Sequence, residues 1–167
     1  MDQQEVQDYK LQLAKKIEVQ RELNNRKEKE KYRDDFKAFA KDQLRIITKD
    51  ATQGYVPFEF NEAQQLIHDK VEEQLKSKGR VRALVLKARQ QGISTYTAGR
   101  VFWKTYYAPH TRSVVIAHDS ATSDALFTMS RNYIDRMSDL YKPELIKSNA
   151  KEILLYSEHI LLDNQGA

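Results

Sequence analysis

The spacing of apolar residues changes along the chain, and each change marks a predicted element. Residues 1–32 are rich in Gln, Glu and Lys and contain no glycine or proline, which predicts a long helix. Its apolar stripe is weak, with Tyr9, Leu13 and Ile17 at four-residue spacing, and the residues after it are charged nearly all round. This pattern favours a solvated, partly frayed arm. An amphipathic arm that docks a partner subunit is the alternative.

A regular apolar stripe begins at residue 35 and marks the expected start of the ordered domain. We predict a helix over 35–48, an extended segment over 55–60 and a second helix over 62–76 that Asn61 caps and Gly79 ends. The side chains expected to be buried are Phe36, Phe39, Ala40, Leu44 and Ile47 in the first helix and Ala63, Leu66, Ile67, Val71 and Leu75 in the second.

An almost uninterrupted apolar run at 81–86 is the centre of the predicted domain. Such a run is typical of a strand buried on both faces of a parallel sheet. A glycine-bearing loop follows, and Ser94 and Thr95 then open a helix that continues over 96–107. A β-branched strand over 113–117 is expected to pair in parallel with the first strand through a right-handed crossover. The pattern therefore predicts an α/β fold in which strand, loop and helix form a phosphate-binding unit.

The remaining residues predict one more helix and a hairpin. Residues 121–138 are amphipathic, and we expect Asp119 to cap this helix rather than to contact nucleic acid. Pro143 ends the segment. Residues 153–156 and 159–162 then predict the two strands of a hairpin.

Composition places limits on the class of protein. The chain has 167 residues, the length of one ordinary domain, and a net charge of +4, which is compatible with a polyanion partner. The absence of cysteine excludes disulfide scaffolds and thiolate metal sites and fits a reducing cytoplasm. No apolar run approaches the length of a membrane span, about 20 residues, and the start is not a signal peptide. We therefore expect a soluble intracellular protein without a membrane partner.

The loop after the 81–86 run carries the candidate chemistry. A phosphate loop points backbone N–H groups inward, and the following helix adds the positive end of its dipole. Aligned on Gly92 with the standard pattern G-x-x-x-x-G-K-[ST], the chain has Lys87 at the first glycine and Ile93 at the lysine. The strict pattern is not met, but Lys87 and Arg89 are cations that could fold over phosphates. A basic, capped connection without a ligand is the alternative for the loop alone.

A second segment, Phe58 to Gln65, precedes this loop and suggests a partner for a purine base. An aromatic ring can stack on a purine, and a glutamine amide can both donate to and accept from the adenine edge. Gln64 has the required amide, and Phe58 or Phe60 supplies the ring. A capped surface helix is the alternative for this segment alone.

Together the two segments resemble the large terminase subunits of tailed bacteriophages, the ATP-driven motors that package viral DNA. The loop KARQQGIST is similar to the displaced-lysine loop of that family, and F-x-x-N-x-x-Q over 58–64 is similar to its adenine-reading Q motif. The resemblance covers about residues 36–167. It implies an incomplete P-loop NTPase domain over 35–167, with a RecA-like or helicase-like parallel sheet flanked by helices, and a charged helical arm over 1–34.

The resemblance also implies a role for each residue of the loop. Lys87 would take the phosphate-lysine role, Arg89 would sense or stabilise the γ-phosphate, and Ser94 would hold Mg²⁺. The remaining contacts with ATP are expected from Phe58, Phe60, Gln64, Ala88, Gln90, Gln91, Gly92, Ile93 and Thr95.

For the whole protein, the resemblance implies an ATP hydrolase that translocates double-stranded DNA into a procapsid and an endonuclease that cuts it. The implied partners are viral double-stranded DNA, the portal protein, the small terminase subunit and further copies in a ring, in the host bacterial cytoplasm. A P-loop ATPase also needs an acidic residue pair after a second apolar strand, and the nearest candidate, Asp163, is followed by Asn164. We therefore interpret the chain as the amino-terminal part of such a motor, which at most binds nucleotide. The alternatives are a helicase-like translocase fragment and a non-enzymatic assembly piece with a degenerate loop.

Overall fold

The computed structural model describes residues 3–48, 52, 54–108, 110–148 and 153–156. The chain divides into two compact units, Met1–Asp35 and Phe36–Ala167. The first unit contains α1, Gln3–Glu30, which confirms the predicted long helix. Leu13 and Ile17 of its weak stripe are both exposed, and so are Leu11, Val19 and Leu23. α1 therefore buries little apolar surface of its own, as its polar sequence predicts.

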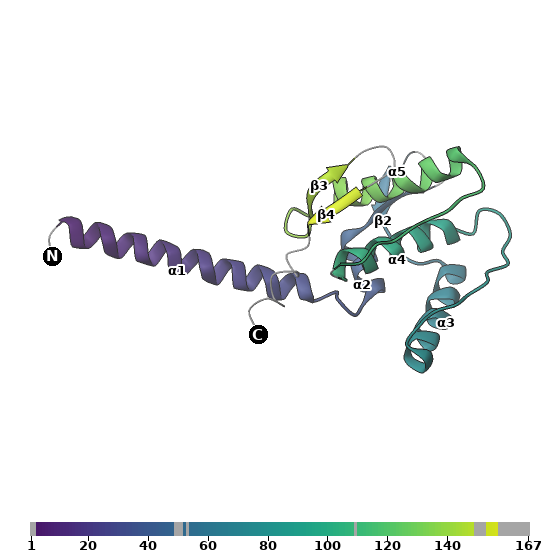
Figure 1. The fold of residues 1–167 in the computed structure, drawn as a ribbon, viewed down its shortest axis with the longest axis horizontal. Coiled ribbons are helices and arrows are strands. Elements are labelled where there is room, and N and C mark those ends of the chain that lie inside the picture. The colour runs from purple at the N-terminus through teal and green to yellow at the C-terminus, as the bar shows by residue number, and fades with distance from the viewer. Residues whose placement is uncertain (1–2, 49–51, 53, 109, 149–152, 157–167) are drawn as a thin grey trace. The chain divides into compact units, whose positions relative to one another are not determined.

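The second unit contains helices and short antiparallel strand pairs, and α4 contacts α2, α3 and α5. No helix in the described ranges is long and apolar enough to cross a membrane. The elements are α2 (Phe36–Gln43), β1 (Arg45–Ile47), β2 (Tyr55–Pro57), α3 (Glu62–Lys78), α4 (Ile93–Tyr107), α5 (Ser120–Arg136), β3 (Glu144–Ser148) and β4 (Ile153–Tyr156) (Figure 1).

Local sequence explains where α3 and α5 begin. Asn61 accepts a hydrogen bond from the Gln64 N–H at 2.9 Å, and the Gln64 side chain accepts from the Asn61 N–H at 3.0 Å, which is a capping box. Gly79, with φ of +66°, ends α3 in the left-handed conformation that glycine favours. Asp119 accepts from the Thr122 N–H at 2.7 Å and caps α5. The predicted caps at Asn61 and Asp119 are confirmed.

The predicted helix over 35–48 is too long. α2 ends at Gln43, and Arg45–Ile47 pairs antiparallel with Tyr55–Pro57. Leu44 is fully buried, as expected, whereas Ile47 is 61% exposed. A short apolar run fits a helix or a strand equally well, and here strand pairing decides between them.

An aromatic core holds the second unit together. The Phe36 ring lies 5.5 to 5.6 Å from the rings of Tyr96 and Trp103, measured between centroids. A Cβ on Gly99 would lie only 3.1 Å from Phe58, so the missing side chain lets α4 approach the Phe58 ring. Tilted and edge-on ring pairs of this kind contribute about 0.5–1.5 kcal/mol each beyond the burial of their area. The buried rings are Phe36, Phe39, Phe58, Tyr96, Phe102, Trp103, Tyr106, Tyr107, Tyr133 and Tyr141.

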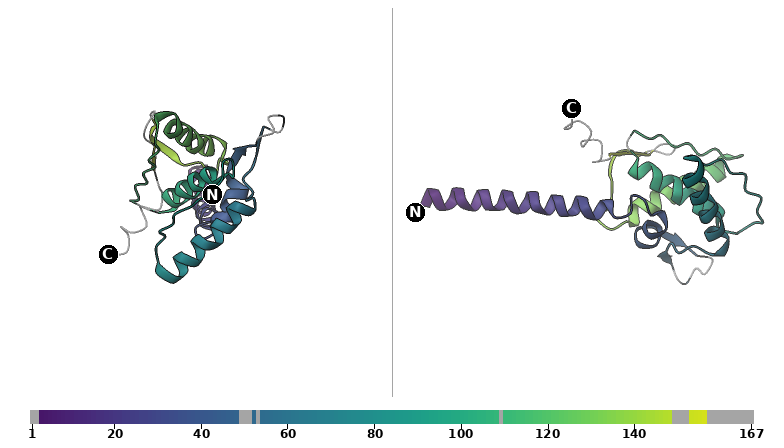
Figure 2. Two further views of the ribbon diagram at one scale, coloured as in Figure 1. Left: turned by 90° about the vertical axis from the view of Figure 1, so that its right-hand side faces the viewer. Right: turned by 90° about the horizontal axis from the view of Figure 1, so that it is seen from below.

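The predicted parallel sheet, and with it the α/β P-loop NTPase fold, is wrong. Both described sheets are antiparallel pairs, β1 with β2 and β3 with β4. The segments 81–86 and 113–117 form no strand, and neither Figure 1 nor Figure 2 draws an arrow over them. Leu84 and Leu86 are fully exposed, and Ile116 is 90% exposed. The described part of the second unit is mainly helical instead.

The failure has a physical reason. An apolar run predicts burial only where other elements cover it, and a strand also needs a hydrogen-bonding neighbour. Among the described residues, neither segment has a partner strand. The Arg82 N–H donates instead to the side chain of Gln74 in α3. The apolar pattern predicted that a central strand would be buried, but the aromatic side chains of α4 are buried instead.

The predicted hairpin is confirmed only in its first strand. β4 covers residues 153–156 as expected, but its partner in the structure is β3, which the sequence analysis did not predict. Glu144 pairs with Tyr156, and Ser148 pairs with Ile153. The second predicted strand, 159–162, and Asp163 lie outside the described residues.

Candidate functional site

The connection into α4 is a tight turn. Gln90 and Gly92 both have positive φ, +61° and +71°. This conformation is uncommon for a residue with a side chain and ordinary for glycine. α4 begins at Ile93, with Gly92 as its N-cap and without a side-chain cap. The helix therefore opens one residue before Ser94, and its first N–H groups donate no hydrogen bond to a capping side chain.

Two amide side chains from the start of α3 hold this turn. Asn61 Nδ2 donates to the Gln91 carbonyl at 3.3 Å, and Gln64 Nε2 donates to the Gly92 carbonyl at 2.7 Å. We call Asn61 and Gln64 the amide clamp. Gln64 is only 4% exposed, so little water competes for its hydrogen bond. Segments 28 and 30 residues apart in the chain are thus in direct contact.

The residues predicted to bind phosphate divide into exposed and buried groups. Lys87, Arg89 and Ser94 are exposed and so are Ala88, Gln90 and Gln91, while Thr95 is half-buried. Ile93, at the position of the standard lysine, is 7% exposed and belongs to the core. A lysine side chain there would bring its ammonium group into apolar surroundings at high cost. In this loop the cations available to solvent are Lys87 and Arg89.

The residues predicted to contact adenine lie at the start of α3. Phe58 is fully buried, and its ring centroid lies 5.3 Å from that of the half-buried Phe60. Both ends of the Gln64 carboxamide have partners, since Oε1 accepts from the Asn61 N–H and Nε2 donates to the Gly92 carbonyl. Stacking on adenine by Phe58 or Phe60 and pairing by Gln64 stay predictions.

Tyr133 of α5 contacts the first turn of α4. Its hydroxyl donates to the Thr95 carbonyl at 3.3 Å, and the residue is 1% exposed. Burial raises the pKa of this phenol far above its ordinary value, so Tyr133 remains a neutral donor. The loop before α4 is therefore tied to α3 through the amide clamp, and the first turn of α4 is tied to α5 through Tyr133.

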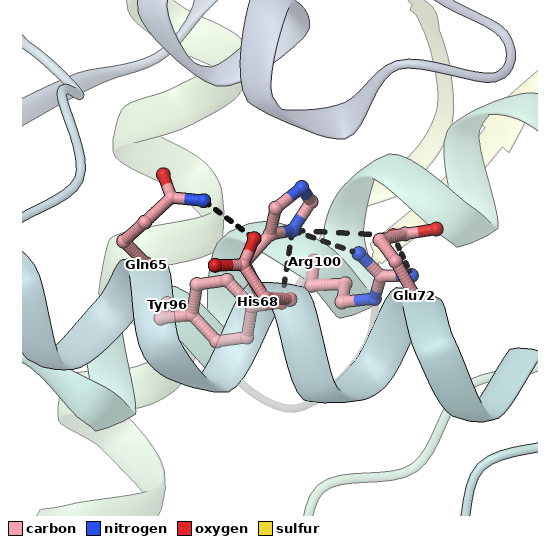
Figure 3. Close-up of polar contacts among 6 residues, drawn as sticks. Gln65, His68, Glu72, Tyr96 and Arg100 are labelled. Carbon is pink, nitrogen blue, oxygen red and sulfur yellow. Dashed lines mark hydrogen bonds and ion pairs between the residues drawn. The ribbon is translucent and has the colours of Figure 1, made fainter.

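Four polar side chains join α3 to α4 beyond the amide clamp (Figure 3). The Glu72 carboxylate lies 2.7 Å from Arg100 Nη2, and His68 Nδ1 lies 3.3 Å from the Tyr96 hydroxyl. In Figure 3 His68 and Glu72 from α3 point toward Tyr96 and Arg100 from α4. The guanidinium of Arg100 also lies over the ring of Trp103, 5.5 Å from its centroid. These contacts fix the two helices that carry the candidate site.

His68 is held neutral within this network. Burial lowers its pKa below the ordinary value, the nearby Glu72 carboxylate raises it in part, and the Arg100 charge lowers it further. The Tyr96 hydroxyl and Arg100 Nη1, at 3.3 and 3.5 Å from Nδ1, can both donate to that nitrogen. This arrangement fits the tautomer that carries its proton on Nε2.

The structure also bears on protein-only metal sites. No group of three or more His, Cys, Asp or Glu side chains among the described residues could hold a metal ion. The ligands of the Mg²⁺ expected at Ser94 would include phosphate oxygens of the nucleotide and water. The role of Ser94 therefore stays a prediction.

Comparison with known proteins assigns no family. No protein-family model matches the chain, and no curated protein gives a significant match. The terminase interpretation therefore depends on the resemblance of the loop and the glutamine segment alone.

The contacts that fix the loop were not predicted from the sequence. Asn61 was predicted as a cap for α3 and not as a donor to Gln91. Tyr133 lies within the amphipathic helix predicted over 121–138, and its hydroxyl was not predicted as a donor to Thr95. The spacing N-x-x-Q is a signal for a capping box, and a capping box with two amides leaves two NH₂ groups beside the helix terminus. That signal could have indicated a backbone partner, but not which one.

Proposed function

We propose that the chain binds ATP at residues 87–95 and is the ATP-binding part of a viral DNA-packaging motor that translocates double-stranded DNA into procapsids. One observation carries the proposed nucleotide site: Gln64 Nε2 donates to the Gly92 carbonyl at 2.7 Å. Segments that bind the base and the phosphates of one nucleotide must lie side by side. The glutamine segment and the loop are 28 residues apart in the chain and meet this requirement.

The chemistry of the turn supports a phosphate ligand. The first turn of α4 offers backbone N–H groups and the positive end of the helix dipole. Gly92 has no Cβ, which leaves room for the Gln64 amide to hold the backbone of the loop. Lys87 and Arg89 are exposed in the same loop and can neutralise the triphosphate, and the exposed Ser94 is in the first turn. This site uses the loop, α3 and α4 and needs no parallel sheet.

The wider role follows from the resemblance alone. Double-stranded DNA, the portal protein, the small terminase subunit and a ring of copies would be partners of the whole motor. ATP hydrolysis and DNA cleavage would likewise belong to the whole protein. For this chain the proposal is nucleotide binding.

A non-enzymatic assembly piece is the second candidate, and the burial of Ile93 favours it. In the standard pattern the residue at this position is the lysine that reaches the outer phosphates. Here that position serves packing, with 7% of Ile93 exposed. If Lys87 and Arg89 do not replace the lysine, the loop binds no nucleotide.

Calorimetric titration of Mg-ATPγS into the chain separates the two candidates. We expect binding by the wild type and about tenfold or greater weakening in Lys87→Ala and Arg89→Ala, since a hydrogen bond to a charged group contributes about 1.5–3 kcal/mol. Lys104→Ala is the matched control, because Lys104 is an exposed cation in the last turn of α4. A folded wild-type chain that binds no Mg-ATPγS would favour the assembly piece.

A further inference from the structure

We propose that Asn61 and Gln64 are positioning residues of the phosphate loop, which turn the N–H groups of Gly92 and Ile93 toward the triphosphate. This inference rests on the proposed nucleotide-binding function. It assigns Gln64 to the loop backbone, a role separate from reading adenine.

Peptide geometry sets the direction of the Gly92 and Ile93 N–H groups. A trans peptide is planar, so the C=O of one residue and the N–H of the next point in opposite directions. The amide clamp binds the carbonyls of Gln91 and Gly92, at 3.3 and 2.7 Å. The N–H groups of Gly92 and Ile93 must then point away from these donors. Two successive N–H groups oriented alike can share one anion.

The Gly92 carbonyl oxygen accepts two hydrogen bonds. This oxygen accepts from the Tyr96 N–H at 3.0 Å in the first turn of α4, in addition to Gln64 Nε2 at 2.7 Å. A carbonyl oxygen has two lone pairs, and both are used here. Rotation of the Gly92–Ile93 peptide would break both bonds, one of them shielded from water. The orientation of the Ile93 N–H is therefore fixed before any ligand arrives.

Preorganisation of this kind affects the phosphate end of any ligand. Donors that already point at the position of a charge lose no orientation entropy when the charge binds. If Gln64 acts on the loop, its loss weakens the binding of a triphosphate whether or not that triphosphate carries a base. If Gln64 acts only on adenine, a base-free triphosphate binds as before. Inorganic tripolyphosphate is the probe that distinguishes the two roles.

Two substitutions remove the donors and keep the cap of α3. Asn61→Ser retains an oxygen that can cap the helix and loses the amide nitrogen without adding charge. Gln64→Glu retains an oxygen for the Asn61 N–H and loses Nε2. Gln65→Glu is the matched control for charge, because Gln65 is the next residue of α3 and its side chain bonds Asp69 rather than the loop.

The experiment titrates Mg-ATPγS and tripolyphosphate into the full chain and these three variants. We expect Asn61→Ser and Gln64→Glu to bind both ligands about fivefold more weakly than Gln65→Glu does. Variants that bind tripolyphosphate as tightly as the control would overturn the inference and leave the proposed function intact. A folded wild type that binds neither ligand overturns the proposed function and this inference with it.

Hydrogen exchange of the ligand-free chain tests the contacts independently of any ligand. The Gly92 and Ile93 amides should change their exchange rates in Asn61→Ser and Gln64→Glu and keep them in Gln65→Glu. Unchanged rates in the first two variants would mean that the amide clamp does not hold the turn, which also contradicts the inference.

Discussion

At the scale of single residues, Gly92 is restricted both by its backbone conformation and by a close neighbouring side chain. Its φ of +71° disfavours any side chain, and an added Cβ would lie 2.6 Å from Gln64 Nε2. Gly79 has nearly the same φ, +66°, but an added Cβ there meets nothing within 4 Å. The two glycines therefore separate the cost of backbone conformation from the cost of a clash.

Gly92→Ala should destabilise the chain more than Gly79→Ala. We expect about 1–2 kcal/mol for Gly79→Ala from the left-handed backbone alone. Gly92→Ala adds the displacement of the buried Gln64 amide, which we expect to bring the total to about 2–4 kcal/mol. Urea denaturation measures both. Equal losses in the two variants would contradict the close contact between Gly92 and Gln64.

The residues of the candidate site were predictable because their signals are local, whereas their partners were not. Gly92 and Ser94 are recognisable from eight consecutive residues, and Asn61 from its place before a helix. The contact of Gln64 with Gly92 spans 28 residues, and no spacing rule relates the two. The burial of Ile93 depends on the aromatic core packed by other elements, so the loop sequence does not reveal it.

At the scale of elements, α3 and α4 act as one support for the site. Their contacts combine the amide clamp at one end with the Glu72–Arg100 ion pair and the His68–Tyr96 contact further along. Arg100 is 14% exposed in its side chain, and Glu72 is 34% exposed, so this ion pair is partly shielded from water. Removing only one partner of such a pair is destabilising, because it leaves the other charge partly buried and uncompensated.

His68 should make the stability of the chain depend on pH. Its pKa in the folded chain is lowered, chiefly by burial, so the unfolded chain binds the proton more tightly. The stability that the neutral ring supports is complete above the ordinary pKa of 6.5 and decreases as the pH falls through that value toward the folded pKa. We expect a lower free energy of unfolding about one pH unit below 6.5 than about one unit above it.

His68→Phe tests this assignment, because it keeps a ring among the neighbouring rings and removes the titrating nitrogen. The loss of stability between the two pH values, measured by urea denaturation, should become smaller in this variant. His110→Gln is the control, since His110 is exposed. A pH dependence that disappears in His110→Gln and persists in His68→Phe would contradict the assignment to His68.

The predicted helices were confirmed far better than the predicted strands. Helix signals such as the Asn61 cap and the Gly79 stop lie within a few residues of the helix they define. A strand depends on a partner elsewhere in the chain. The apolar run at 81–86 has the composition of a buried strand, but its partner could not be deduced from its own residues, and the described residues contain none.

At the scale of the whole molecule, the distribution of apolar residues is uneven. Aromatic side chains fill the core of the second unit, while apolar residues of the segments 81–86 and 113–117 face solvent, among them Leu84, Leu86, Val114 and Ile116. Exposed apolar stretches of this kind promote association between molecules. The net charge of +4 offers only modest repulsion against it.

Leu84→Ser and Leu86→Ser should therefore leave the free energy of unfolding within about 0.5 kcal/mol of the wild type. Leu44→Ala, at a fully buried leucine, should cost about 2–5 kcal/mol. Chemical denaturation measures all three, and sedimentation should find less association in the two serine variants. A loss for Leu84→Ser as large as that for Leu44→Ala would show that this leucine is buried in solution.

Because Asn61 makes hydrogen bonds in two segments, it couples the local unfolding of one segment to that of the other. One side chain completes the first turn of α3 through its oxygen and holds the Gln91 carbonyl through its nitrogen. The start of α3 cannot fray without releasing the turn before α4, and a loosened turn removes a restraint on the start of α3. The two segments should open and close as a single cooperative unit, although 30 residues separate Asn61 from Gln91 in the chain.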